Sequence, residues 1–301
     1  MNPPASTLFT SPPDWQWLIV LYFFLGGIAG GAYFLAALMD LRGAPGDRPV
    51  ARLGYLVAFP LTVICAILLT GDLGRPLRFW HMLIQSRTGM PMFKGYSPMS
   101  IGAWALLIFG GLSLLSFLGA LAEREPRLAW ASRLRSPGLV GGVIAVHGAG
   151  VGFFVAGYTG VLLAVSNRPI WADTPFLGLL FLVSGASSGA ALLLLLAGPR
   201  IGWRGVMALE EFDRTVLVLE IMAVIAVVLS LGGLVRLWLN LWGLLLVGVV
   251  VVGILIPLAL YWRPRAANAL TAAAVLVLVG SFLLRVVIIF SSEAVAGRIL
   301  S

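Results

Sequence analysis

The chain has 301 residues, of which 60% are hydrophobic and only 11% are charged, and its formal net charge is +8. Because soluble domains carry about 25% charged residues, this composition excludes a soluble domain and predicts an integral membrane protein embedded in a lipid bilayer. Lys and Arg mark the cytoplasmic loops and headgroup contacts of such proteins, so we read the positive charge in that way and expect no nucleic-acid partner.

Cysteine and histidine usage limits the redox groups that the protein can hold. Cys65 is the only cysteine, and His81 and His147 are the only histidines. A single cysteine excludes disulfides and any iron–sulfur cluster held by this protein alone, and we interpret Cys65 as a buried structural thiol. Two histidines are too few for two haems with paired histidine ligands, although their number leaves room for one. No metal-ligand spacing is present, so we expect no metal site.

Eight apolar runs are long enough to cross a bilayer, which takes about 20 residues of helix. Backbone polar groups need internal partners in lipid, so continuous apolar runs predict helices, whereas a barrel would show alternation. The protein is therefore expected to be an all-α integral membrane protein with eight transmembrane helices. The runs cover residues 16–39, 51–70, 99–121, 139–163, 175–197, 215–235, 241–261 and 268–290.

Arginine-rich loops predict the orientation of the protein. Loops 40–52, 122–138, 198–214 and 261–267 hold three, four, three and two arginines, whereas loops 164–174 and 236–240 hold one each. The positive-inside rule assigns the first group to the cytoplasm, which makes both termini extracytoplasmic. The segment 71–98 breaks this rule, because it holds four basic residues on the outer side, and binding is one explanation for the exception.

A weak internal repeat suggests that the protein has two halves. "FFLGGIAGGA" (23–32) aligns with "FLVSGASSGA" (181–190) at a constant offset of 158 residues, and both segments run from outside to inside. Small residues of this kind let helix backbones approach closely, so a chance recurrence of packing faces is an alternative. We predict two four-helix bundles, one formed by residues 1–165 and the other by residues 166–301.

The stretch "GDLGRPLRFWH" (71–81) places four ionisable residues three positions apart at the end of the second run. Pro76 disfavours helix at Arg75, so the backbone is expected to bend there. The three-residue spacing stays aligned only in a 3₁₀ turn. An acid at the hydrocarbon boundary is costly unless it is paired or functional, which makes Asp72 a candidate site residue. Arg78, Arg87 and Lys94 fit either headgroup contact or docking of a partner.

The fourth run carries His147 and Tyr158, which are 11 residues apart and therefore on one helix face, about 16 Å apart along the axis. This spacing suits a ligand near Tyr158 and a proton route through His147. The alternatives are an interface tyrosine and a core histidine satisfied by a neighbour.

Three further charges lie within or beside apolar runs, where ionisable groups are functional candidates by default. Glu220 and Asp213 are seven residues apart on one helix face. Glu220 and His147 are expected at a similar depth in the membrane, so His147 is a possible partner of Glu220. Arg285 is expected to pair with Asp72 or, alternatively, to extend to the membrane surface. The predicted proton relay is therefore His147, Glu220, Asp213 and Arg285.

Three motifs resemble the NrfD/PsrC family, the membrane subunits of polysulfide reductase-type respiratory complexes. They are "DWQWLIVLYFFLGGIAGGAYF" (14–34), "GDLGRPLRFWHML" (71–83) and "GYTGVLLAVSNRPIWADTPFL" (157–177), and they occur in the family's order over essentially the whole sequence. The resemblance implies two four-helix bundles without haem or iron–sulfur cluster, in the cytoplasmic (inner) membrane. It also implies a quinone site, for menaquinone or ubiquinone, at the outer face beside a docked four-cluster iron–sulfur subunit. A molybdopterin-type catalytic subunit usually completes such complexes.

The resemblance assigns candidate roles to individual residues. Asp72, His81 and Tyr158 match motif residues near the quinone head group and are the expected catalytic residues. Gln16, Trp17 and Arg75 join them as expected cofactor-binding residues. Some relatives have His where this protein has Gln16, and an amide can hydrogen-bond a carbonyl but cannot accept a proton at neutral pH. Proton transfer is therefore assigned to Asp72 or His81.

The resulting hypothesis is the quinone-reactive subunit of an oxidoreductase complex, with no catalysis expected from the isolated protein and with proton movement as an added role. The alternatives are a secondary transporter and a purely structural membrane anchor. Transporters carry Gly- or Pro-interrupted helices at the membrane midplane, and the first and fifth runs contain such small residues. However, the polar groups of this protein cluster at the outer face.

Overall fold

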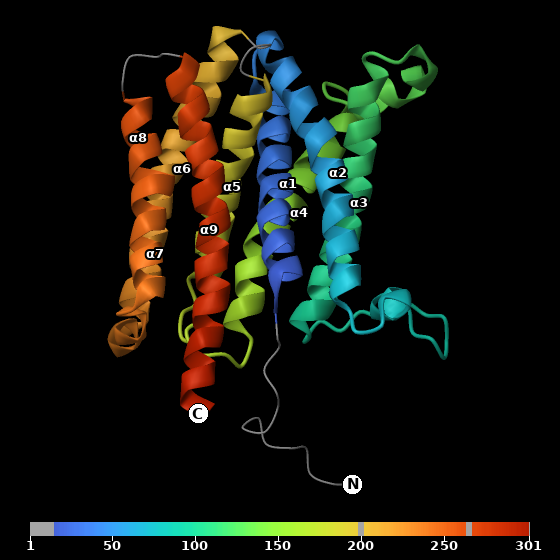
Figure 1. Ribbon diagram of the computed structural model, residues 1–301. Coiled ribbons are helices and arrows are strands. Elements are labelled where there is room, and N and C mark those ends of the chain that lie inside the picture. The colour runs from blue at the N-terminus through green and yellow to red at the C-terminus, as the bar shows by residue number, and fades with distance from the viewer. Residues whose placement is uncertain (1–14, 198–201, 263–266, 301) are drawn as a thin grey trace.

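The computed structural model describes residues 15–197, 202–262 and 267–300, and this part of the protein is a bundle of long, roughly parallel and antiparallel helices (Figure 1). The long helices are α1 (Trp17–Arg42), α2 (Arg48–Asp72), α3 (Pro98–Ala122), α4 (Leu139–Ala164), α5 (Leu177–Ala197), α6 (Trp203–Ser230) and α9 (Ala267–Leu300). A further span is built from α7 (Leu241–Val250), a π-helical turn η6 (Val251–Leu255) and α8 (Ile256–Tyr261). Short helical turns lie at the ends of the bundle: η2 (Pro45–Asp47), η3 (Pro76–Met82), η4 (Pro126–Leu134) and η5 (Gly232–Trp238).

Seven helices of the described residues are long and apolar enough to cross a membrane, and α6 with η5, bent by 103°, makes an eighth candidate. The prediction of an all-helical, multi-pass membrane protein is therefore confirmed. The start of α1 and the end of α9 lie at the same end of the molecule as η3 (Figure 1). The two-bundle arrangement and the extracytoplasmic location of both termini stay predictions, and residues 1–14 lie outside the described part.

Helix α6 differs most from its predicted range. It begins at Trp203, 12 residues before the predicted start at 215, so much of the predicted 198–214 loop is helical. The charged residues of this segment are typical of a loop, which is why the sequence predicted one there. In the structure, helical spacing turns Glu210, Asp213 and Glu220 inward to buried positions, while Arg204 and Glu211 face outward. The charges therefore belong to a buried polar face of a helix.

Helices α1 and α5 pack through the two glycine-rich segments of the predicted repeat. A Cβ added to Gly27 would lie 3.2 Å from the Gly185 Cα, and Gly189 likewise approaches the backbone of Gly31. This contact needs residues without side chains, because the two backbones approach each other too closely for a Cβ. The repeat segments therefore join the first helices of the two predicted halves, and the division into halves itself stays a prediction.

At the end opposite η3, Arg135 forms an ion-pair network that no sequence motif predicted. Its guanidinium lies 2.9 Å from Asp40 Oδ1 and 2.7 Å from Glu123 Oε1, and it stacks over the Tyr55 ring at 5.4 Å. Arg135 is 5% exposed, so its charge requires these partners. The network links α1, the end of α3 and the segment before α4.

The segment between α2 and α3 bends as predicted. Helix α2 ends at Asp72, and Arg75 has the non-helical angles φ −138° and ψ 79° immediately before Pro76. Residues 76–82 form the 3₁₀ helix η3, which puts Arg78 and His81 on one face. A short hairpin follows, in which Met92 N donates to Leu83 O at 2.8 Å and Gly89 takes a positive φ of 68°.

Candidate functional site

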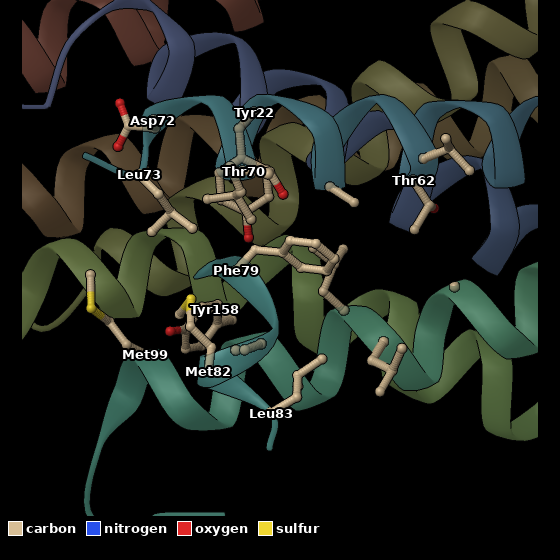
Figure 2. A pocket seen from close by; sticks show the side chains of 18 of the residues that line it. Tyr22, Thr62, Thr70, Asp72, Leu73, Phe79, Met82, Leu83, Met99 and Tyr158 are labelled. Carbon is tan, nitrogen blue, oxygen red and sulfur yellow. The ribbon is translucent and has the colours of Figure 1, made fainter. Parts of the chain in front are cut away.

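A cavity of about 440 Å³ lies between α1, α2, α3 and α4, and η3 covers its outer end (Figure 2). Its polar lining residues are Tyr22, Thr62, Thr70, Asp72 and Tyr158. Figure 2 shows Phe79 and Met82 of η3 reaching into the cavity between the α2 side chains and Tyr158. The bend at Pro76 therefore folds η3 back over the space between the helices.

The remainder of the cavity is an apolar slot between α2 and α3. It extends along α2 from Asp72 to Phe59, a distance of about 20 Å at 1.5 Å per residue. Gly110 and Gly111 line the α3 side, and their lack of side chains keeps the slot open. Val63 and Leu107 line it while 39% and 51% exposed, so the slot opens onto the apolar outer surface. The site thus joins a few polar groups at one end to a long apolar channel.

Tyr158 is held rigidly at the polar end. Its hydroxyl donates to the carbonyl oxygen of Pro98, the first residue of α3, at 2.5 Å, and the residue is only 6% exposed. The ring packs directly on Gly102, where an added Cβ would overlap the ring atoms. It also stacks with Phe154 at 5.7 Å between ring centroids. These contacts make Tyr158 a buried side chain of the cavity wall.

The first-helix motif places a different aromatic in the cavity from the one predicted. Trp15 lines the cavity with Ile19, and it stacks on Trp171 at 5.4 Å. Gln16 and Trp17 are exposed and absent from the cavity lining, and Trp17 packs on Phe290 instead. Trp15 lies before the start of α1 at Trp17, and the extended backbone at Gln16 leads from Trp15 on the cavity side to the exposed Gln16 and Trp17. Gln16 and Trp17 thus lie outside the cavity lining, and their role in quinone binding stays a prediction.

Trp171 anchors the loop that follows α4. Its Nε1 donates to the Ile288 carbonyl at 2.8 Å, and the Arg168 guanidinium lies over its ring at 5.5 Å. The loop of the third sequence motif therefore supports the Trp15 wall of the cavity. The structural role of this motif depends on contacts between residues far apart in sequence, such as Trp171 with Trp15 and Ile288.

The ionisable residues of 71–81 separate in the structure. Asp72 lines the cavity on the α2 side, while Tyr158 lies on the α3 side (Figure 2). His81 is half-buried, lies against Trp80 at 3.9 Å between ring centroids and is not part of the cavity lining. Arg75 is exposed at the start of η3. The structure thus brings Asp72 and Tyr158 to one cavity and leaves Arg75 and His81 at its edge.

The outer surface of the 73–97 segment mixes positive charge with exposed apolar side chains. Arg78, Arg87 and Lys94 are all exposed. The large apolar or aromatic side chains beside them are Leu77, Met90, Phe93 and Tyr96, with exposed fractions of 63% to 90%. We call these seven residues the outer-loop surface.

A second set of polar groups lies buried between α5, α6, α8 and α9. The Asp213 carboxylate accepts hydrogen bonds from Ser187 at 2.5 Å and from Tyr261 at 2.6 Å. Glu220, two turns along α6, is also buried and interacts electrostatically with Arg285. Asp213, Glu220 and Arg285 thus belong to one buried set, which we call the polar row.

Arg285 has different partners from those predicted. It is fully buried, so the prediction that it extends to the membrane surface is wrong. Its Nε donates to the Phe23 carbonyl at 3.1 Å, and its Nη1 donates to the Ser281 hydroxyl at 2.6 Å and to Ser184 at 3.2 Å. The predicted pairing with Asp72 is not seen, because Arg285 points from α9 toward the middle of α1.

His147 lies outside the polar row. Its side chain is exposed, and its Nδ1 lies 2.9 Å from the Val143 carbonyl of its own helix. Val143 and Val146 on the same face are also exposed, so this face of α4 points out of the protein. The predicted pairing of His147 with Glu220 is therefore not seen.

Within the described residues, no group of three or more His, Cys, Asp or Glu side chains is arranged to hold a metal ion. Cys65 is buried on α2, as predicted for a structural thiol, and its sulfur lies 3.8 Å from the Tyr22 carbonyl.

Comparison with known proteins identifies the family. The profile of the family described as "Polysulphide reductase, NrfD" matches residues 9–296. The protein belongs to the NrfD family. One relative is the C subunit of polysulfide reductase from Wolinella succinogenes, which is 29% identical over 94% of this sequence and 95% of its own. Another is the NrfD protein of Escherichia coli, which is 26% identical over 93% of this sequence and 95% of its own. The NrfD homologue of Haemophilus influenzae is 28% identical over 93% and 94%. The NrfD match spans all three motifs and the cavity that they line.

Proposed function

We propose that this NrfD-family protein is the quinone-reactive membrane subunit of a multi-subunit respiratory oxidoreductase. The observation that carries the proposal is the cavity with a polar outer end and an apolar slot of about 20 Å. Binding sites for small molecules and cofactors are mostly apolar, with a few polar groups that fix the orientation of the ligand. A quinone has this division, because its head group carries two polar oxygens and its isoprenoid tail is apolar.

Asp72 and Tyr158 are the residues best placed to contact the head group of menaquinone or ubiquinone. A bound quinol supplies two electrons and two protons when it is oxidised. Tyr158 orients the head, and Asp72 accepts a proton at the rim, with His81 as the second candidate acceptor near the outer end. Gln16, Trp17 and Arg75 lie outside the cavity lining, so any contribution from them is indirect.

We propose the outer-loop surface as the docking site for an iron–sulfur subunit of the four-cluster type. Arg78, Arg87 and Lys94 supply positive charge that complements an acidic partner, and the exposed aromatic residues supply apolar contact area. Leu77 and Arg78 of this surface belong to η3, which covers the cavity, so a partner docked on η3 would give electrons a short path. A molybdopterin-type catalytic subunit would then complete the complex.

The orientation follows from the arginine-rich end. Arg48, Arg52 and Arg135 lie at the end of the bundle opposite η3, which the positive-inside rule assigns to the cytoplasm. The quinone site and both termini then face outward from the cytoplasmic membrane. The eight spans are proposed to form two four-helix bundles, as the resemblance implies.

The polar row favours a second role, in proton movement. Buried ionisable side chains inside membrane helices are costly and mark proton or ion routes. Asp213, Glu220 and Arg285 form such a set, and Arg285 also contacts α1, which lines the quinone cavity. We propose that these three residues carry protons or respond to the redox state of the site, without His147, which faces outward.

Photolabelling tests the quinone site directly. The intact complex would be irradiated with an azido-quinone that carries the reactive group on its ring or its tail. Ring labels are expected near Asp72 and Tyr158, and tail labels in 59–69 or 103–114. Labels confined to α5–α9 would refute the proposed site.

A further inference from the structure

The hydrogen bonds around Tyr158 indicate which redox form of the ligand the cavity prefers. A tyrosine hydroxyl has one proton to donate and two lone pairs to accept. The single proton of Tyr158 points to the Pro98 carbonyl oxygen, 2.5 Å away. The hydroxyl therefore keeps its lone pairs for accepting hydrogen bonds and has no free proton to donate.

Gly102 holds this arrangement in place. The Tyr158 ring lies on Gly102 so closely that any Cβ there would overlap the ring. Pro98 and Gly102 are four residues apart at the start of α3, so the same turn holds both the hydroxyl and the ring of Tyr158. The direction of the hydroxyl proton is thus fixed by contacts with α3.

Other polar groups of the cavity show the same bias. The Thr62 hydroxyl donates to the Ala58 carbonyl of its own helix at 2.8 Å, so its proton is also engaged. Ionised Asp72 is an acceptor only. Tyr22 and Thr70 are the cavity residues whose hydroxyls can serve as either donor or acceptor. The cavity therefore offers mainly acceptors to a ligand that brings its own donors.

We propose that Tyr158, positioned by Gly102 and Pro98, accepts a hydrogen bond from a quinol hydroxyl and makes this cavity selective for quinol over quinone. This inference rests on the proposed quinone site. A quinone has carbonyl acceptors only, so Tyr158 could bind it only by giving up its bond to Pro98. The lost net hydrogen bond corresponds to a preference for quinol of roughly tenfold. A tenfold preference raises the midpoint potential of the bound two-electron couple by about 30 mV.

The test measures dissociation constants of 2-methyl-1,4-naphthoquinone and of its quinol on the intact complex, by competition with a fluorescent site inhibitor. Wild-type protein is expected to bind the quinol roughly tenfold more tightly. Tyr158→Phe removes the acceptor, so the ratio of the quinone and quinol dissociation constants is expected to fall to about one. Gly102→Ala is expected to have the same effect, because the added Cβ displaces the Tyr158 ring. Gly150→Ala is the matched control, because Gly150 lies on α4, as Tyr158 does, and has no atom within 4 Å of an added Cβ.

The outcomes separate the two proposals. Equal binding of the two forms by wild-type protein, or an unchanged ratio in Tyr158→Phe, overturns the selectivity while the quinone site stands. Failure of both forms to compete in wild-type protein overturns the site itself. If Gly102→Ala prevents assembly, Tyr158→Phe still decides the question, since it deletes a single oxygen.

Discussion

The Arg285 guanidinium on α9 donates a hydrogen bond to the backbone carbonyl of Phe23 on α1, at 3.1 Å and across 262 positions of sequence. Phe23 lines the cavity proposed to bind quinone, and Arg285 also interacts electrostatically with Glu220 of the polar row. The carbonyl of an apolar residue in the cavity wall is thereby connected to buried ionisable groups on α6. A movement of α1 on ligand binding would therefore change the hydrogen bond between Phe23 and Arg285.

Replacing Arg285 by Met is expected to destabilise the protein by about 3 kcal/mol, because the buried acceptors on Phe23, Ser184 and Ser281 lose their donor and Glu220 loses a favourable electrostatic interaction. Thermal denaturation of the purified complex measures the loss. The double variant Arg285→Met with Glu220→Gln should recover part of it, since no uncompensated charge remains. Arg236→Met is the control, because Arg236 is exposed and its loss should change stability by no more than about 0.5 kcal/mol. A double variant less stable than both single variants would contradict the electrostatic explanation.

Asp72→Asn and Tyr158→Phe are expected to lower quinol-linked turnover while the complex still assembles. The loss should be roughly 100-fold for Asp72→Asn, if Asp72 accepts a proton in the reaction. For Tyr158→Phe it should be about tenfold, because one orienting hydrogen bond is lost. Turnover with soluble electron donors that bypass the membrane subunit should stay normal. Unchanged quinol turnover in both variants would remove these residues from the site.

Gly110→Phe is expected to obstruct the apolar slot, because Gly110 faces Thr62 across it and an added Cβ would lie 3.9 Å from the Thr62 Cγ2. The KM for a long-tailed quinol should rise about tenfold, which equals the loss of burial of roughly two CH₂ groups. The KM for a quinol without a tail should stay the same, and this comparison is the internal control. An equal rise for both substrates would indicate a distorted head-group site.

Glu220→Gln is expected to change the number of protons released per electron pair while leaving electron transfer to soluble dyes intact. The substitution retains the shape of the side chain and its capacity to hydrogen-bond but removes the ionisable group. Proton release would be followed with the complex in sealed vesicles. His147→Gln serves for comparison, because His147 is exposed and outside the polar row. Unchanged proton stoichiometry in Glu220→Gln would exclude Glu220 from a relay.

A reporter fused to the C-terminus is expected to read as extracytoplasmic. Helix α9 ends on the same side of the bundle as η3, opposite the arginine-rich end (Figure 1). A second fusion in the loop that contains Arg127 should read as cytoplasmic. The reverse pattern would place the quinone site on the cytoplasmic face.

The sequence by itself determined the features that depend on local composition and local geometry. Long apolar runs specified most of the helices to within a few residues, because lipid requires internal backbone hydrogen bonds. Pro76 specified the bend and the 3₁₀ turn after α2, since proline restricts its own backbone and that of Arg75. The motif at 157–177 predicted a site role for Tyr158, which lines the cavity; the role itself stays a prediction.

Only the tertiary structure decided which side chains meet. In the structure Trp15 lines the cavity, whereas the sequence had favoured its neighbours Gln16 and Trp17. Arg285 bonds to Phe23 on α1, whereas the sequence had suggested Asp72 as its partner. It also showed that Tyr158 is held by Pro98 and Gly102, 60 and 56 positions earlier in the sequence. A helix's apolar pattern in lipid does not reveal which face meets which neighbour, because lipid and protein interior are equally apolar. Close backbone packing, at α1–α5 and at Gly102, settles those contacts.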